Sequence, residues 1–253
     1  MIKIEKTDVF GWESAIRGMR NPMNSWDKSD SAYGDPDCED CPCLGVVNYE
    51  ENCCKSSQYN CPTEFEVGEN DLKLMKSLSK AGSDHAKYLR YIVVQLDITA
   101  PLYWWKEFKT YRRGRQFMDD GDELLDPEEL EMFIETNSCS TMHKIHSKEF
   151  TSDDFSTEHL EDLWLNDFYC LLWSLNEARN KYLETKDKKY WWQMITLLPS
   201  SYNQKRTVQL NYQVLKSMYF ARKNHKLDEW REFCKWIENL PCSELITGEK
   251  NDE

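Results

Sequence analysis

Alternation between apolar and polar positions predicts three strands. The segments RYIVVQLDIT and RTVQLNY place apolar side chains on every second residue, and MIKIEKTDVF places Ile2, Ile4 and Lys6 on one face. This period of two is typical of strands that are buried on one face only. The predicted inward positions are Ile2, Ile4, Ile92, Val94, Leu96, Ile98, Val208 and Leu210.

Apolar residues spaced three and four apart predict helices elsewhere. The longest runs from about His159 to Lys186, and its predicted buried stripe is Leu160, Leu163, Phe168, Leu171, Leu175 and Tyr182. Pro101 can open another helix at its first position. The remaining helices are predicted over 11–21, 70–81, 101–111, 213–223 and 226–240, and KYWWQMITLLP is a further apolar segment.

These elements predict an α+β fold with a small antiparallel sheet and long flanking helices, in a single domain over residues 1–253. Two stretches interrupt it. Residues 23–68 lack helical periodicity and form an irregular, Cys-rich insertion, and residues 113–136 form an acidic insertion with a short surface helix from Pro127. We expect residues 243–253 to be a frayed tail.

Charge and composition exclude some classes of protein. The 253 residues include 32 basic and 45 acidic side chains, which gives a net charge of −13. A chain of this net charge is not expected to bind a nucleic-acid polymer, although it can contain a local basic pocket for a nucleotide. No apolar run approaches the ~20 residues of a membrane helix, and the N-terminus has no signal-peptide-like stretch. We therefore expect a soluble, cytoplasmic protein.

Six cysteines lie close together in the first insertion: Cys38, Cys41, Cys43, Cys53, Cys54 and Cys61. Thiolates at such spacing can hold a zinc ion or an iron–sulfur cluster, here with sulfur ligands alone. Disulfides are a competing reading, although the cytosol keeps thiols reduced, and unbonded thiols are a third. His143 and His146 would share a helix face as metal ligands or an acid/base pair, or be ordinary surface residues.

The segment ITAPLYWWKEFKTYRRGR is the densest in chemically useful groups. A strand leads into an aromatic helix that ends in Thr110, Tyr111, Arg112 and Arg113. Arginine suits a helix C-terminus for its dipole alone, and it also suits a site that binds phosphate or flavin beside aromatic rings. The rings lie on more than one face of the helix, so we expect this helix to lie near a subunit interface.

A longer segment that includes this strand and helix, from residue 71 to Arg112, resembles the flavin-dependent thymidylate synthase (ThyX) family. Ile98-Thr99-Ala100-Pro101 resembles the family's turn before the helix, Glu107 stands at its Gln, and Thr110-Tyr111-Arg112 stand at its Arg-His-Arg. Downstream, Leu198-Pro199 and the segment QLNYQVLKSMYFAR place Asn211 and Arg222 on the family's Asn and Arg. Residues 16–20 resemble its Arg-Ala-Ala-Arg stretch.

The resemblance implies a homotetramer that binds FAD and dUMP, with NADPH and methylenetetrahydrofolate as co-substrates. Reduced flavin would supply the hydride, and the protein would supply positioning and electrostatics. The implied site residues are Glu107, Tyr111 and Arg112 for catalysis; Thr110, Arg112, Asn211 and Ser217 for the cofactor; and Glu107, Ser138, Ser140, His143, Lys144 and Arg222 for the substrate.

The chain also departs from the family pattern. Thr110 and Tyr111 replace an Arg and a His, and the family's Ser-rich stretch resumes only at 137–144, where Lys144 stands in place of the phosphate-gripping Arg. An acid at Glu107 can accept a hydrogen bond from an amino group, which favours a cytosine-type nucleotide. Two alternatives are a catalytically silent nucleotide-binding or assembly protein of the same fold, and a metal-stabilised interaction protein.

Overall fold

The computed structural model describes residues 2–33, 65–112 and 134–248, and the chain divides into two compact units. One unit comprises Met1–Val9 and Val93–Thr247, and the other comprises Phe10–Ile92 and Gly248–Glu253. Helices and antiparallel strand pairs make the fold α+β, which confirms the predicted class. No helix within the described ranges has the length and apolarity needed to span a membrane.

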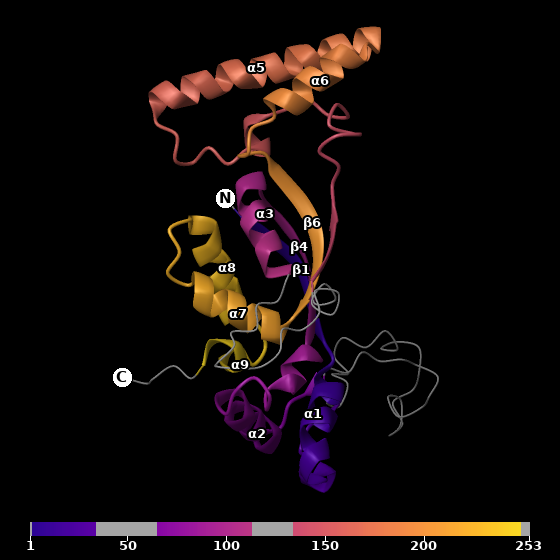
Figure 1. Ribbon diagram of the computed structural model, residues 1–253, viewed down its shortest axis with the longest axis vertical. Coiled ribbons are helices and arrows are strands. Elements are labelled where there is room, and N and C mark those ends of the chain that lie inside the picture. Colours follow the sequence, from indigo (N-terminus) through magenta and orange to yellow (C-terminus); the bar gives the residue numbers. More distant parts are fainter. Residues whose placement is uncertain (1, 34–64, 113–133, 249–253) are drawn as a thin grey trace, which may run out of the picture. The chain divides into compact units, whose positions relative to one another are not determined.

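A four-stranded sheet in the order β1-β4-β6-β5 organises the first unit (Figure 1). Its strands are β1 (Lys3–Phe10), β4 (Val93–Pro101), β5 (Glu135–Ser138) and β6 (Asn203–Asn211). β6 pairs antiparallel with β4 along its whole length, from Val93 opposite Asn211 to Pro101 opposite Asn203. The three predicted strands are confirmed, and their predicted inward residues on β4 and β6 are buried.

The strand β5 was not predicted. It pairs antiparallel with β6, with Glu135 opposite Gln209. The preceding Ile134 is buried. Residues 135 and 136, at the end of the predicted acidic insertion, therefore belong to the sheet. Residues 113–133 lie outside the described ranges.

The helices of the first unit follow the strands closely. They are α3 (Leu102–Phe108), α5 (Asp162–Thr185), α6 (Lys188–Leu197), α7 (Tyr212–Arg222), α8 (Asp228–Glu238) and α9 (Glu244–Thr247), with 3₁₀ turns η6 (Lys109–Arg112) and η8 (Ser152–Asp154). Asn211 ends β6 and caps α7, because its side chain accepts the N–H of Val214 at 3.0 Å. The sheet thus delivers α3 and α7 directly from its two central strands.

Two apolar clusters fill this unit. Buried rings of α3 pack on those of α8, and the centroids of Trp104 and Trp230 lie 4.8 Å apart. The second cluster joins α5 and α6 to the segment before them and consists of Ile145, Phe150, Phe155, Phe168, Leu175, Ala178 and Met194. The helix 101–111 was expected to expose aromatic faces to a partner subunit, but Trp104, Trp105 and Phe108 are buried within the chain itself.

Other expectations also need correction. Leu160 precedes α5 and Leu163 lies in its first turn, and both are exposed because only the middle of α5 meets the second cluster. The tail does not fray from residue 243, since α9 buries Leu245 and Ile246. Residues 141–148 form turns rather than a helix, so His143 and His146 share no helix face.

The second unit contains α1 (Trp12–Arg20), α2 (Glu69–Lys80), the short strand pair β2 (Ala32–Tyr33) and β3 (Phe65–Glu66), and the 3₁₀ turns η1 (Asn21–Met23), η2 (Trp26–Lys28) and η5 (Lys87–Arg90). Gly11 precedes α1 at φ 90°, where an added Cβ would lie 2.0 Å from the Tyr91 carbonyl oxygen. Only glycine fits this position.

A buried ion pair joins α1 to α2. Arg20 Nε donates to Asp71 Oδ1 at 2.6 Å, and both side chains are buried. Ser29 and Ser31 donate to the other carboxylate oxygen at 2.6 and 2.7 Å. These contacts fix the residues leading to β2, whose pairing with β3 places Tyr33 opposite Phe65. That segment, with its six cysteines, lies outside the described ranges.

Candidate active site

Three of the residues proposed from the sequence meet at the end of α3. They are Glu107 on α3, Tyr111 on η6 and Arg222 at the end of α7. Two further residues contact Glu107: His225 in the loop before α8, and Trp230 on α8. We call these five residues the Glu107 cluster. α3 and α7 start at opposite ends of the antiparallel β4–β6 pair, after Pro101 and Asn211, and α8 packs its rings on α3.

The Glu107 carboxylate is the common acceptor of the cluster. Its Oε2 accepts the indole N–H of Trp230 at 2.9 Å and lies 3.3 Å from Arg222 Nη1. His225 Nε2 lies 3.6 Å from the same oxygen. The Glu107 side chain is 39% exposed and that of Arg222 is 20% exposed, so the ion pair lies at a partly open surface.

Arg222 contacts two polar groups, the Tyr111 hydroxyl and the Glu107 carboxylate, and two aromatic rings. Its Nε donates to the Tyr111 hydroxyl oxygen at 2.7 Å. Its guanidinium carbon lies 5.0 Å from the ring centroid of Trp230 and 5.3 Å from that of Tyr111. Nε and Nη1 are thus engaged within the chain, and Nη2 is the donor group that neither contact uses.

Tyr111 can donate as well as accept. Burial raises the pKa of Tyr111, and the neighbouring Arg222 opposes that rise without cancelling it. The phenol therefore keeps its proton at neutral pH. Since its oxygen already accepts from Arg222, the hydroxyl hydrogen is available to an acceptor outside the pair.

His225 is fixed by its backbone neighbour. Its Nδ1 accepts the N–H of Leu227 at 3.2 Å, so a neutral ring carries its proton on Nε2, which faces Glu107. The sequence did not identify His225 or Trp230 as site residues. Trp230 lies within the helix predicted over 226–240, and nothing in that pattern shows that its indole N–H reaches a carboxylate.

The predicted cofactor residues lie on η6, at the end of β6 and on α7. Thr110 Oγ1 donates to the backbone oxygen of Glu107 at 2.7 Å, and Ser217 Oγ donates to that of Gln213 at 3.2 Å. Asn211 is buried and uses its Oδ1 for the cap of α7. Arg112 ends η6, and its side chain is not among those described.

The remaining predicted substrate residues form a separate group after β5. Ser138 ends β5 opposite Arg206, and Ser140 Oγ accepts the N–H groups of Met142 and His143. His143 and Lys144 are exposed. Within the described ranges, no hydrogen bond or ion pair joins this group to the Glu107 cluster.

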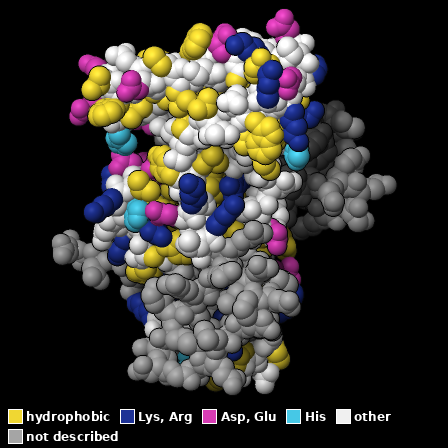
Figure 2. Space-filling model, turned by 45° about the horizontal axis from the view of Figure 1, so that its top comes forward, with side chains coloured by type: hydrophobic (Ala, Val, Ile, Leu, Met, Phe, Trp, Pro, Cys, Tyr) yellow, Lys and Arg dark blue, Asp and Glu magenta, His cyan; other side chains and the backbone are white. Residues whose placement is uncertain are grey.

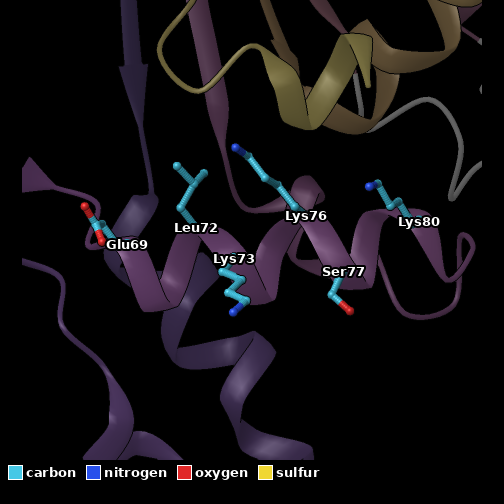
Figure 3. Close-up of a pocket in the computed structure, with 6 residues that line it drawn as sticks. All are labelled: Glu69, Leu72, Lys73, Lys76, Ser77 and Lys80. Atoms are coloured by element: carbon cyan, nitrogen blue, oxygen red, sulfur yellow. The ribbon is translucent and has the colours of Figure 1, made fainter. Parts of the chain in front are cut away.

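An open depression of about 490 Å³ lies elsewhere, along α2 (Figure 3). Its lining consists of Glu69, Leu72, Lys73, Lys76, Ser77 and Lys80, all from one helix. None of these was proposed from the sequence as a site residue. The described residues also contain no group of three or more His, Cys, Asp or Glu side chains placed to hold a metal ion.

Solved structures share this fold. Thymidylate synthase X (ThyX) from Helicobacter pylori, in a crystal structure with FAD and dUMP, matches with a TM-score of 0.58 at 12% identity, covering 98% of each chain. A second structure of that organism's ThyX, also complexed with FAD and dUMP, matches with the same TM-score and coverage at 13% identity. No family model matches the sequence. No curated protein sequence matches it either. The chain therefore has the ThyX fold at a sequence distance where the fold alone is shared.

Proposed function

We propose that this chain is a flavin-dependent thymidylate synthase-like enzyme. It would bind FAD and a pyrimidine deoxynucleotide, dUMP or a variant of it, and add a one-carbon unit reductively at C5 of the base. The observation that carries the proposal is the meeting of Glu107, Tyr111 and Arg222 within a fold shared over nearly the whole chain with proteins solved with FAD and dUMP.

The Glu107 cluster fits an anionic or carbonyl-rich ligand. Arg222 Nη2 and the Tyr111 hydroxyl offer hydrogen-bond donors on neighbouring side chains, which suits a phosphate or a pyrimidine carbonyl. Glu107 holds the arginine in place through its Oε2. Its other oxygen can accept from an amino group, so the cytosine-type substrate stays part of the proposal.

The start of α7 fits a flavin. Gln213 Oε1 is buried, and no described residue donates to it. Such an orphaned acceptor calls for an N–H donor from a ligand. The Nδ2 of the neighbouring Asn211 takes no part in the helix cap. When bound, the flavin supplies the hydride.

We further propose that NADPH and methylenetetrahydrofolate are the co-substrates, that the protein assembles as a homotetramer, and that it is located in the cytoplasm.

A catalytically silent nucleotide-binding or assembly protein is the second candidate. The engagement of Arg222 Nε and Nη1 within the chain favours it, because a bidentate grip on a ligand would first have to displace Tyr111 or Glu107. Oxidation of NADPH that depends on dUMP and methylenetetrahydrofolate separates the two: the enzyme shows it, and the silent protein binds nucleotide without it.

Nucleotide binding tests the proposal. We expect dUMP or dCMP to bind the FAD-loaded protein in calorimetry, and Arg222→Lys to bind it about ten- to a hundredfold more weakly, because lysine loses the planar fork. Arg231→Lys, the same change at an exposed arginine of α8, should leave the affinity unchanged. If neither nucleotide binds the wild type, the proposed function is wrong.

We also propose that four of the six thiolates among Cys38, Cys41, Cys43, Cys53, Cys54 and Cys61 hold one structural metal ion, zinc or iron. The β2–β3 pair would form the base of that module. Elemental analysis of anaerobically purified protein is expected to find the metal, and protein free of both elements contradicts this part.

A further inference from the structure

The turn between α5 and α6 gathers positive charge on a chain that is acidic overall. Residues 179–192 include five basic and two acidic side chains, whereas the whole chain has 32 basic and 45 acidic ones. Lys189 pairs with Asp187 at 3.1 Å. The other four basic residues form no ion pair with any described carboxylate; they are Arg179, Lys181, Lys186 and Lys188. Their charge is therefore not neutralised within the described part of the chain.

The segment before α5 meets the same charge. Arg179 Nε donates to the backbone oxygen of His146 at 3.1 Å, and the rings of His146 and Tyr182 have their centroids 4.9 Å apart. Burial lowers the pKa of His146, and the positive charges of Lys144, Lys186 and Arg179 lower it further. The electrostatic field at this imidazole is therefore positive, although the net charge of the chain is −13.

Aromatic rings lie beside these cations. Lys188 Nζ is 5.8 Å from the ring centroid of Trp191 and 5.8 Å from that of Trp192. The Trp191 indole donates to the Met142 carbonyl at 3.0 Å, which fixes its ring, whereas Trp192 is 50% exposed. Figure 2 shows dark blue and yellow side chains close together at the upper right of the view, on the side where Figure 1 places the α5–α6 turn. The turn thus offers an exposed ring and several cations close to one another.

We propose that the α5–α6 turn binds a nucleoside di- or triphosphate. The base packs on Trp192, and the phosphates bind Arg179, Lys186 and Lys188; we call these four residues the turn site. Cations beside an exposed ring are the arrangement that recognises a flat base joined to an anionic phosphate chain. More than one phosphate is required, because a single phosphate carries too little charge to offset three cations.

The net charge of the chain argues against larger anionic occupants. A long nucleic-acid strand or an anionic membrane would extend beyond the turn and be repelled by a chain of net charge −13. An uncharged protein partner would bury the cations of the turn without providing a counter-charge, which is costly. A small ligand satisfies both conditions, since it places its negative charge only where the cations lie.

This inference does not rest on the proposed function. The turn site shares no residue with the Glu107 cluster, and Lys144, which the resemblance groups with the substrate, is left unchanged in every variant of the test. Nucleotide binding at the turn can therefore fail while dUMP binds, or succeed while dUMP does not bind. Two variants separate these outcomes, since Arg222→Lys should keep the affinity for ATP and the turn-site variants should keep the affinity for dUMP.

Calorimetry on the full-length protein with ATP and UTP tests the proposal. We expect both nucleotides to bind the wild type. Lys186→Ala combined with Lys188→Ala should weaken binding at least about tenfold, because charge-assisted contacts to the phosphates are lost. Trp192→Ala should weaken it roughly five- to a hundredfold through lost stacking. Lys73→Ala combined with Lys80→Ala removes two exposed lysines from α2 and should leave the affinity unchanged. Circular dichroism checks that each variant is folded.

Two further ligands distinguish the source of the phosphates. Inorganic tripolyphosphate has the charge without the base and should bind about tenfold more weakly than ATP. A single-stranded oligothymidylate should bind no more tightly than UTP. Equal affinity for tripolyphosphate, tighter binding of the strand, absence of binding by both nucleotides, or unchanged affinity in the turn-site variants each overturns the proposal.

The imidazole of His146 gives a readout that ordinary solvated lysines would not. Burial and three neighbouring cations lower its pKa, and a phosphate chain on Arg179 and Lys186 offsets two of those cations. The pKa of His146 should therefore rise when ATP saturates the protein. Proton NMR titration measures this rise, and comparison with His146→Gln assigns the resonance. A pKa of His146 that is the same with and without ATP contradicts the site.

Discussion

Arg222 has three roles to consider, two from the sequence and one from the structure. At the end of a helix it suits the dipole, worth typically 0.3–1 kcal/mol, and the resemblance gives it a nucleotide to bind. The structure adds a third role, since Arg222 links Tyr111 to Glu107 and lies near the ring of Trp230. A ligand therefore meets an arginine that is already oriented, with little conformational entropy left to lose.

Asp71 carries a prediction for pH. Burial alone would raise the pKa of Asp71, but hydrogen bonds from Ser29, Ser31 and Arg20 outweigh burial and hold it below its ordinary value of 3.8. A carboxyl group whose pKa is lower in the folded chain stabilises the fold above about pH 3.8, and that contribution is lost as the pH falls toward the lowered pKa.

We therefore expect Asp71→Asn to lower the free energy of unfolding by about 3–5 kcal/mol at neutral pH, because Arg20 loses its buried partner. This deficit should shrink as the pH falls below 3.8, which denaturant titrations at a series of pH values measure. The exposed residue Asp84 offers the control, and Asp84→Asn should follow the wild type throughout. A deficit that stays constant down to low pH contradicts the assignment.

At the scale of elements, periodicity predicted most of the framework. β4, β6, α2, α7 and α8 lie where the sequence placed them, because each has a clear apolar face that the fold buries. Periodicity failed where an element depends on a distant partner. β5 (ETNS) has no apolar alternation and exists because β6 offers it a ladder. The four-residue α9 exists because the core accepts Leu245 and Ile246.

Asn211 joins two elements, and substitutions can separate its two roles. Asn211→Ala should cost about 1 kcal/mol in the free energy of unfolding, because the Val214 N–H loses its cap acceptor. Asn211→Ser keeps a cap oxygen and should restore most of that loss in thermal denaturation.

Flavin retention then isolates the second role of Asn211. Serine has no amide, so Asn211→Ser should release flavin more readily than the wild type although the helix cap is kept. Equal flavin content in the serine variant and the wild type would assign Asn211 to the cap alone.

At the scale of the molecule, the candidate site was only partly predictable. Motif order supplied Glu107, Tyr111 and Arg222, but 111 residues separate Tyr111 from Arg222, and only the folded chain brings them together. The sequence also groups Ser138, Ser140, His143 and Lys144 with them, and no hydrogen bond or ion pair between described residues joins these four to the Glu107 cluster. A linear motif lists residues but does not show which of them share a surface.

The aromatic helix α3 also shows that a linear pattern does not reveal which side chains are exposed. Its aromatic side chains on several faces suggested an interface, yet β6 and α8 of the same chain cover them, with Trp105 Nε1 donating to the Gln204 carbonyl. Exposed aromatic residues lie on other elements, including Trp164, Tyr169 and Trp173 on α5. Burial could not be assigned from composition, because aromatic residues occur on both α3 and α5 and the neighbours of each helix decide which of them are covered.

The central claim is that this fold holds a flavin, and the most direct measurement is to identify what the native protein releases. Protein purified under mild conditions is denatured, and the supernatant is analysed by absorbance and mass spectrometry. The account predicts FAD released from a yellow protein, or FAD taken up stoichiometrically when the apoprotein is reconstituted. A colourless protein that neither releases FAD nor takes it up on reconstitution would contradict the account.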